Sequence, residues 1–200
     1  MSSKVGEKLG ESRKNKALAE RNRIILAYFV LAKDKTFQRL SEESKQELIK
    51  EVIAIGDEMA RWVAGEYQTS DPRKIAAQMG ISIFGEEKPS LRRSEYRKEK
   101  KEIAISRKFH QKLLDEVRLP ELSERLLKLV VAHELFHHLE AERLGEVYRR
   151  FKFKIFQIGP LEIYRQIKGL SEVAAQAFTH TLLDLKITPE IFDYLLNFLV

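Results

Sequence analysis

Cysteine is absent from this chain, which therefore forms no disulfide and offers no thiolate to a metal. Any metal ion would have to be held by histidine, aspartate or glutamate. Proline and glycine are scarce, with 5 and 9 of the 200 residues, which excludes collagen-like and low-complexity architectures. Long apolar runs are missing too. Residues 24–32 (IILAYFVLA) form a nine-residue run, whereas a membrane-spanning helix needs about 20.

The same apolar run follows a basic stretch, as in a secretory signal peptide. However, 23 mostly polar residues precede it, which is long for the charged segment of a signal peptide. We therefore interpret residues 24–32 as a buried helix. The expectation is a soluble cytoplasmic protein that does not contact a membrane.

The charge balance is positive, with a formal net charge of +6. Much of the excess comes from residues 4–23, 88–102 and 143–168. In each stretch acidic residues interleave with the basic ones, which is typical of solvated surfaces. We therefore expect no direct binding to nucleic acid, and rank that function lowest.

Helical patterns dominate the chain. We predict helices over residues 17–32, 41–66, 71–80, 120–145, 171–185 and 189–200. Ser41, Asp71 and Ser171 have the residue types and positions of N-caps, and Pro72 follows Asp71 at a first helical position. One or two helical turns are expected within residues 106–117.

Strand signals are few. Residues 81–84 (ISIF) and 102–106 (EIAIS) are predicted as strands, with residues 85–101 as a loop or hairpin tip. Residues 151–158 alternate before Gly159-Pro160, which predicts a loop or short hairpin. Together these signals predict an α+β fold, mostly helical with a small antiparallel sheet.

Residues 130–142 (VVAHELFHHLEAE) contain three of the five histidines. His133 to His137 match the H-E-x-x-H pattern within a predicted helix. Positions i and i+4 share one helix face, so both imidazoles can reach one ion, as in zincin-like sites. Zinc suits such ligands, with another divalent metal as the alternative. Glu134 is the candidate catalytic base.

A catalytic zinc ion takes three protein ligands and keeps one open position. The downstream candidates are Glu140, Glu142, Glu146, Glu162, Glu172, His180 and Asp184. A ligand from a second, crossing helix gives better geometry than Glu140 on the same helix. Glu172 is the best candidate, because it lies in the first turn of the next predicted helix. The extended metzincin pattern is absent, since Glu140 and Arg143 occupy its glycine and histidine positions.

Four further residues are candidates for the outer shell of the site or the wall of its cleft. His138 projects about 100° away from its neighbour His137, which favours an outer-shell or surface role over ligation. Tyr148, Tyr164, His180 and several arginines carry donors that could stabilise an oxyanion. The Gln176 amide could hydrogen-bond a metal ligand or the backbone.

Residues 102–106 precede the site helix. An extended substrate would add to this strand if it formed a sheet edge, and the basic residues 88–101 would then screen substrates by charge. The alternative is ordinary hairpin packing.

The segments MGISIF, EIAIS, VVAHELFHHLE and LSEVAAQAF, in this order, resemble the ImmA/IrrE metallopeptidases over roughly residues 72–185. The resemblance implies that His133, His137 and Glu172 are the metal ligands and that Glu134 is the base. His138 matches the family's frequent second histidine. Gln176 stands where the family has asparagine, and Phe136 where it has glycine.

What the resemblance implies is limited proteolysis of a DNA-binding repressor, which would be a protein partner because this chain has no helix-turn-helix of its own. The expected organisation is a disordered basic arm (residues 1–16), N-terminal helices (17–66) and a zinc metallopeptidase domain (67–200). The expected function is a zinc-dependent endopeptidase. The alternative is a metal-containing regulatory module that sequesters a regulator without cleaving it.

Overall fold

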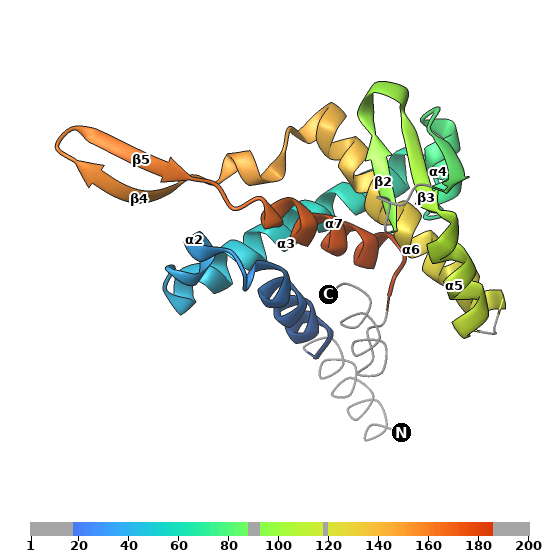
Figure 1. Ribbon diagram of the computed structural model, residues 1–200, viewed down its shortest axis with the longest axis horizontal. Helices are drawn as coiled ribbons and strands as arrows, with labels where there is room; N and C mark the ends of the chain where they lie inside the picture. Colours follow the sequence, from blue (N-terminus) through green and yellow to red (C-terminus); the bar gives the residue numbers. More distant parts are fainter. Residues whose placement is uncertain (1–17, 88–92, 118–119, 186–200) are drawn as a thin grey trace, which may run out of the picture.

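The computed structural model describes residues 18–87, 93–117 and 120–185 (Figure 1). The predicted arm at 1–16 and the predicted last helix at 189–200 lie outside these residues. The first half contains helical residues 18–31, α2 (Lys35–Gln38), α3 (Glu42–Glu66), α4 (Pro72–Gln78), β1 (Ser82–Glu86), β2 (Ser94–Arg97) and η1 (Lys98–Lys100). The second half contains β3 (Glu102–Ser106), α5 (Arg107–Val117), α6 (Pro120–Leu139), η2 (Glu140–Leu144), η3 (Val147–Arg150), β4 (Phe153–Ile158), β5 (Leu161–Arg165) and α7 (Gly169–Leu182).

The prediction of a mostly helical α+β fold is confirmed. The helices also begin largely where their caps predict. Ser41 accepts a hydrogen bond from the Ser44 backbone N–H at 3.2 Å, and Asp71 accepts one from Arg73 N–H at 3.0 Å. The predicted N-cap at Ser171 is wrong, because α7 already begins at Gly169 and the Ser171 hydroxyl lies inside the helix.

The three-stranded sheet has the order β1-β3-β2 and is mixed. β1 runs parallel to β3, with Ile83 opposite Ile103, and β2 runs antiparallel to it. The hypothesis that residues 102–106 form the exposed edge is therefore wrong, since β3 lies in the middle and β2 is the edge. β2 was missed because its sequence, SEYR, is polar and lies in a basic stretch. Within that stretch Arg97 forms ion pairs with Glu86 and Glu95.

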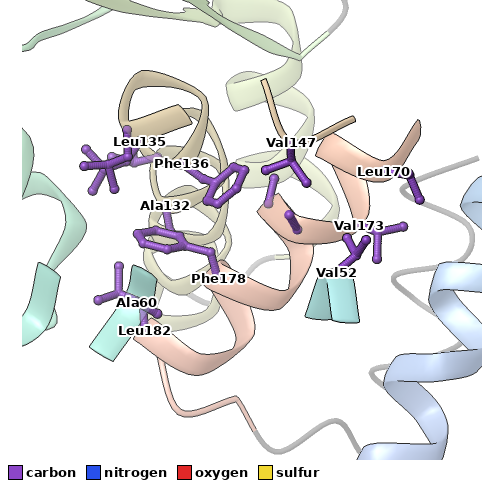
Figure 2. Close-up of a cluster of buried hydrophobic side chains, with 14 of the residues drawn as sticks. Val52, Ala60, Ala132, Leu135, Phe136, Val147, Leu170, Val173, Phe178 and Leu182 are labelled. Carbon is purple, nitrogen blue, oxygen red and sulfur yellow. The ribbon is translucent and has the colours of Figure 1, made fainter. Parts of the chain in front are cut away.

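One hydrophobic core joins the N-terminal helices to the rest of the chain. Figure 2 shows side chains from three helices meeting there: Val52 and Ala60 from α3, Ala132, Leu135 and Phe136 from α6, and Val173, Phe178 and Leu182 from α7. The rings of Phe136 and Phe178 lie 5.6 Å apart between α6 and α7. Packing of this core sets the position of α7 relative to α6, and therefore the position of residues in its first turn.

A polar contact also ties helix 18–31 to this core. Asp57 of α3 accepts hydrogen bonds from the Arg23 guanidinium (Nη1 at 3.1 Å) and from the Thr181 hydroxyl of α7 at 2.6 Å. All three side chains are partly buried, so the bonds are shielded from water. The first described helix is thereby held against α3 and α7.

Gly56 allows the close approach of α3 and α7. A Cβ atom at this position would lie 2.8 Å from both Ala177 Cβ and Phe178 N, and closer still to the Ala174 carbonyl oxygen. We expect Gly56→Ala to lower the free energy of unfolding by about 1–3 kcal/mol, because α3 and α7 must move apart to accommodate the methyl group. Urea unfolding of the purified chain measures this.

Gly65, also in α3, is the matched control. Nothing lies within 4 Å of a Cβ there, so Gly65→Ala is expected to stabilise the helix by roughly 0.5–1 kcal/mol. Equal effects of the two substitutions would show that helix spacing does not depend on Gly56.

The β4–β5 hairpin projects from the body of the protein (Figure 1). It matches the short hairpin considered for residues 151–158. One face carries four apolar side chains that are 41–61% exposed: Phe156, Ile158, Leu161 and Ile163. The other face carries an ion pair between Lys154 and Glu162 at 3.1 Å. The hairpin is thus amphipathic, with an apolar face that no described element covers. Among the described residues, no helix is both long enough and apolar enough to cross a membrane.

Candidate metal centre

Helix α6 presents its two H-E-x-x-H histidines on one face. Leu135 and Phe136, between them, are fully buried in the core, which orients the helix so that His133 and His137 face the cleft. The two Nε2 atoms lie 3.2 Å apart. One turn of helix therefore places both imidazoles where they can reach a common ion.

Glu172 comes from the first turn of α7 and completes the group. One carboxylate oxygen lies 3.2 Å from His133 Nε2, and the other lies 3.6 Å from His137 Nε2. A ligand atom from each of the three residues lies within 4.8 Å of the other two. The cluster that the sequence predicted, His133, His137 and Glu172, could therefore bind a metal ion.

The electrostatics of Glu172 also suit a cation site. The contact with His133 lowers the pKa of Glu172 to about 2, against the opposing effect of burial, and the charge of His137 lowers it further. The side chain is 50% exposed because its outer side opens onto the cleft. Its carboxylate is thus ionised at neutral pH and reachable by a metal.

Glu140 contacts the second histidine, His137, at its Nδ1 ring nitrogen. One carboxylate oxygen lies 3.3 Å from His137 Nδ1, and the other accepts hydrogen bonds from Val147 N–H at 2.6 Å and from the Ser171 hydroxyl. Metal-binding histidines usually have such a carboxylate on the other ring nitrogen. The sequence predicts Glu140 only as a possible metal ligand and does not predict this supporting role. Its spacing of three residues from His137, on the same helix face, was the available signal.

The glutamates around His137 change its pKa. Burial by itself lowers the pKa of His137, but the hydrogen bond to Glu140 and the charges of Glu172 and Glu134 raise it above its ordinary value. A metal ion must displace this proton before it can bind the imidazole. We therefore expect protonation of His137 alone to lower zinc affinity about tenfold for each pH unit below the raised pKa of His137.

Titration calorimetry between about pH 6 and pH 8, in buffers of different ionisation enthalpy, would measure the affinity and the protons released. An affinity that does not change over this range would contradict the prediction.

Glu134 is buried, 5% exposed, and it lies outside the three-residue cluster. Its Oε1 atom accepts a hydrogen bond from the Ser94 hydroxyl at 2.6 Å. Ser94 lies on β2, so the edge strand orients this carboxylate. The sequence does not predict this role of Ser94, because the pattern of residues 85–101 indicates a loop or hairpin tip. A carboxylate beside the candidate metal ligands, but not among them, can move a proton.

The other predicted neighbours divide into two pairs. His138 Nδ1 lies 2.7 Å from the Tyr96 hydroxyl, and burial lowers the pKa of His138. The Tyr148 hydroxyl donates to Glu146 at 3.0 Å. Neither side chain lines the cleft as described. Gln176 and His180 do line it, and burial, aided by the charge of Arg23, lowers the pKa of His180 to about 4.

The cleft over the candidate metal-binding residues has a volume of about 630 Å³. Helix 18–31, β2, α5, α6 and α7 each contribute side chains to its lining. From α7 come Glu172, Gln176, Thr179 and His180, whose spacing places them on one helix face. A cavity of this size accommodates several residues of an extended peptide.

The centre thus combines two histidines and one carboxylate around a common point with a separate buried carboxylate beside them. The cleft in front of them is bordered by β2, the edge strand of the described three-stranded sheet. Comparison with protein-family models, with curated proteins and with solved structures found no match to this chain.

Proposed function

We propose that this chain is a zinc-dependent endopeptidase that cleaves a protein substrate at a limited number of positions. The spacing of the three ligands carries the proposal. Zinc bonds of about 2.0–2.1 Å at tetrahedral angles place ligand atoms about 3.3 Å apart. The Nε2 atoms of His133 and His137 lie 3.2 Å apart. One carboxylate oxygen of Glu172 lies 3.2 Å from His133 Nε2, and the other lies 3.6 Å from His137 Nε2.

When bound by these residues, zinc supplies Lewis acidity, which polarises a carbonyl group and lowers the pKa of a bound water to about 7. Glu134 accepts the proton of the attacking water and then donates it to the leaving amine. The Ser94 hydroxyl holds Oε1 of this carboxylate and so orients it. Glu140 holds the His137 ring by Nδ1, which leaves Nε2 for the metal.

The position of β2 at the edge of the described sheet supports an extended peptide as substrate. Residues 93–96 line the cleft, and Ser94 links this strand to Glu134. A peptide that added to this edge would pass the metal ligands. Because the motif order resembles the ImmA/IrrE metallopeptidases, we further propose a helix-turn-helix repressor as the protein substrate.

One observation favours the alternative of a regulatory binding module. The apolar side chains of the β4–β5 hairpin are 41–61% exposed, and the hairpin projects from the body of the protein (Figure 1). Such a face is typical of protein contact surfaces. A module of this kind would sequester a regulator through the hairpin, and the metal would then have a structural role.

The test is whether the zinc-loaded chain cuts peptides. The full chain is incubated with a complex peptide mixture, and new termini are identified by mass spectrometry. New termini are expected with zinc, are lost when a chelator removes the metal, and return when zinc is restored. Identical termini before and after chelation would rule out a metal-dependent peptidase.

A further inference from the structure

Two helices contribute an apolar wall to the cleft. Six apolar side chains from two helices line it: Leu26, Phe29 and Val30 from helix 18–31, and Leu126, Leu129 and Val130 from α6. On each helix the three positions have the spacing i, i+3, i+4, which places them on one face. Phe109 of α5 adds to the same lining.

Helix 18–31 is apolar on two faces. Ala27 and Leu31 are 2% and 0% exposed and face the core, as expected for a surface helix. Phe29, on the cleft face, is 51% exposed. Packing of the core therefore does not account for Phe29. A large exposed apolar residue in a cleft wall is typical of a ligand-binding surface.

The apolar wall lies close to the reacting groups. Val130 and Leu129 precede His133 by three and four residues, which corresponds to about 4.5–6 Å along the helix. An extended peptide advances about 3.3 Å per residue. A side chain that contacts this wall therefore belongs to a residue one or two positions from the bond over the metal cluster.

From this placement we propose that the cleft selects peptides carrying a bulky apolar side chain, such as leucine or phenylalanine, one or two residues from the cleaved bond. The inference rests on the proposed peptidase function and names its substrate class. A charged side chain would lose its hydration on this wall without gaining a partner among the six apolar residues. Helix 18–31 is thus part of the substrate-binding surface.

Binding of amino-acid hydroxamates tests the preference without requiring catalysis, because the hydroxamate group chelates zinc in each probe. The zinc-loaded full chain is titrated with N-acetylated leucine, phenylalanine, aspartate and lysine hydroxamates, and with acetohydroxamate, which has no side chain. The leucine and phenylalanine probes are expected to bind about tenfold more tightly than the charged ones. Equal affinities, or no binding of any probe, would overturn the inference.

Two matched variants locate the preference on helix 18–31. Phe29→Ser is expected to reduce the preference for the phenylalanine probe several-fold and to leave acetohydroxamate binding unchanged. Leu18→Ser is the control, since Leu18 is 46% exposed on the same helix and does not line the cleft. A loss of acetohydroxamate affinity in Phe29→Ser as large as the loss for the phenylalanine probe would overturn the inference.

The outcome is separable from that of the peptidase proposal. A probe preference without any peptide cleavage would refute the peptidase and leave an apolar binding cleft. Cleavage after residues of every kind, with equal probe affinities, would support the peptidase and refute the substrate class.

Discussion

Replacing Glu134 with glutamine is expected to lower kcat/KM for peptide hydrolysis by roughly 10²- to 10⁴-fold, while the zinc content stays at that of the unmodified chain. The reason is that glutamine cannot accept a proton, yet it keeps the size of the side chain and can still contact Ser94. Glu134 lies outside the metal cluster, so metal binding does not depend on its charge directly. Initial rates of hydrolysis of a peptide substrate measure kcat/KM, and metal analysis of the same sample measures the zinc content.

Ser94→Ala provides a graded control for this experiment. It removes the hydroxyl that orients Glu134 and leaves the carboxylate in place. A decrease much smaller than that of Glu134→Gln, with kcat affected more than KM, is expected for a positioning residue. If the Glu134→Gln protein still cleaved at the original rate, the assignment of the base would fail. If regulation in cells survived the substitution, the binding-module alternative would replace the peptidase.

Replacing Glu172 with alanine is expected to weaken zinc binding by more than 100-fold and to abolish hydrolysis with it. The substitution removes the only ligand contributed by α7 to the described cluster, and leaves two histidines on α6. Competition with a zinc chelator of known affinity measures the loss. Glu172 is exposed on its outer side, so the folded core is expected to survive, and circular dichroism would verify that.

Glu140→Gln is the comparator that separates a direct ligand from a supporting residue. Loss of an outer carboxylate typically costs 10- to 100-fold in metal affinity. A smaller loss is therefore expected than for Glu172→Ala, because His137 keeps its Nε2 and only its orientation is less constrained. Full zinc occupancy in Glu172→Ala, or a larger loss in Glu140→Gln, would remove Glu172 as the third ligand.

Residues close together in the chain could be assigned from the sequence because their physics is local. The caps at Ser41 and Asp71 depend on hydrogen bonds to residues two or three positions away. The pairing of His133 with His137 follows from the pitch of one helix. Ser171 shows the limit of this reasoning, since its hydroxyl bonds to the distant Glu140. A local pattern does not reveal such a competing partner.

Strand β2 shows the same limit in the sheet. Its residues are polar and half-buried, so neither alternation nor β-propensity distinguishes them from a loop. Their pairing with β3 makes them a strand, and thereby places Ser94 beside Glu134. The position of helix 18–31 in the cleft wall also cannot be predicted from the sequence, because periodicity does not show which apolar face packs in the core and which faces the cleft.

The sequence by itself determined the α+β class, most helix starts, and the histidine pair with its neighbouring glutamate, because each follows from the geometry of a single segment. Only the tertiary structure decided which strand forms the sheet edge, that Glu140 supports His137, and that helix 18–31 borders the cleft. It also brings Glu172 within 3.2 Å of His133, although the two residues are 39 positions apart in the chain. The packing of α7 against α3 and α6 produces that approach, and contacts between distant segments depend on this whole core rather than on any local pattern.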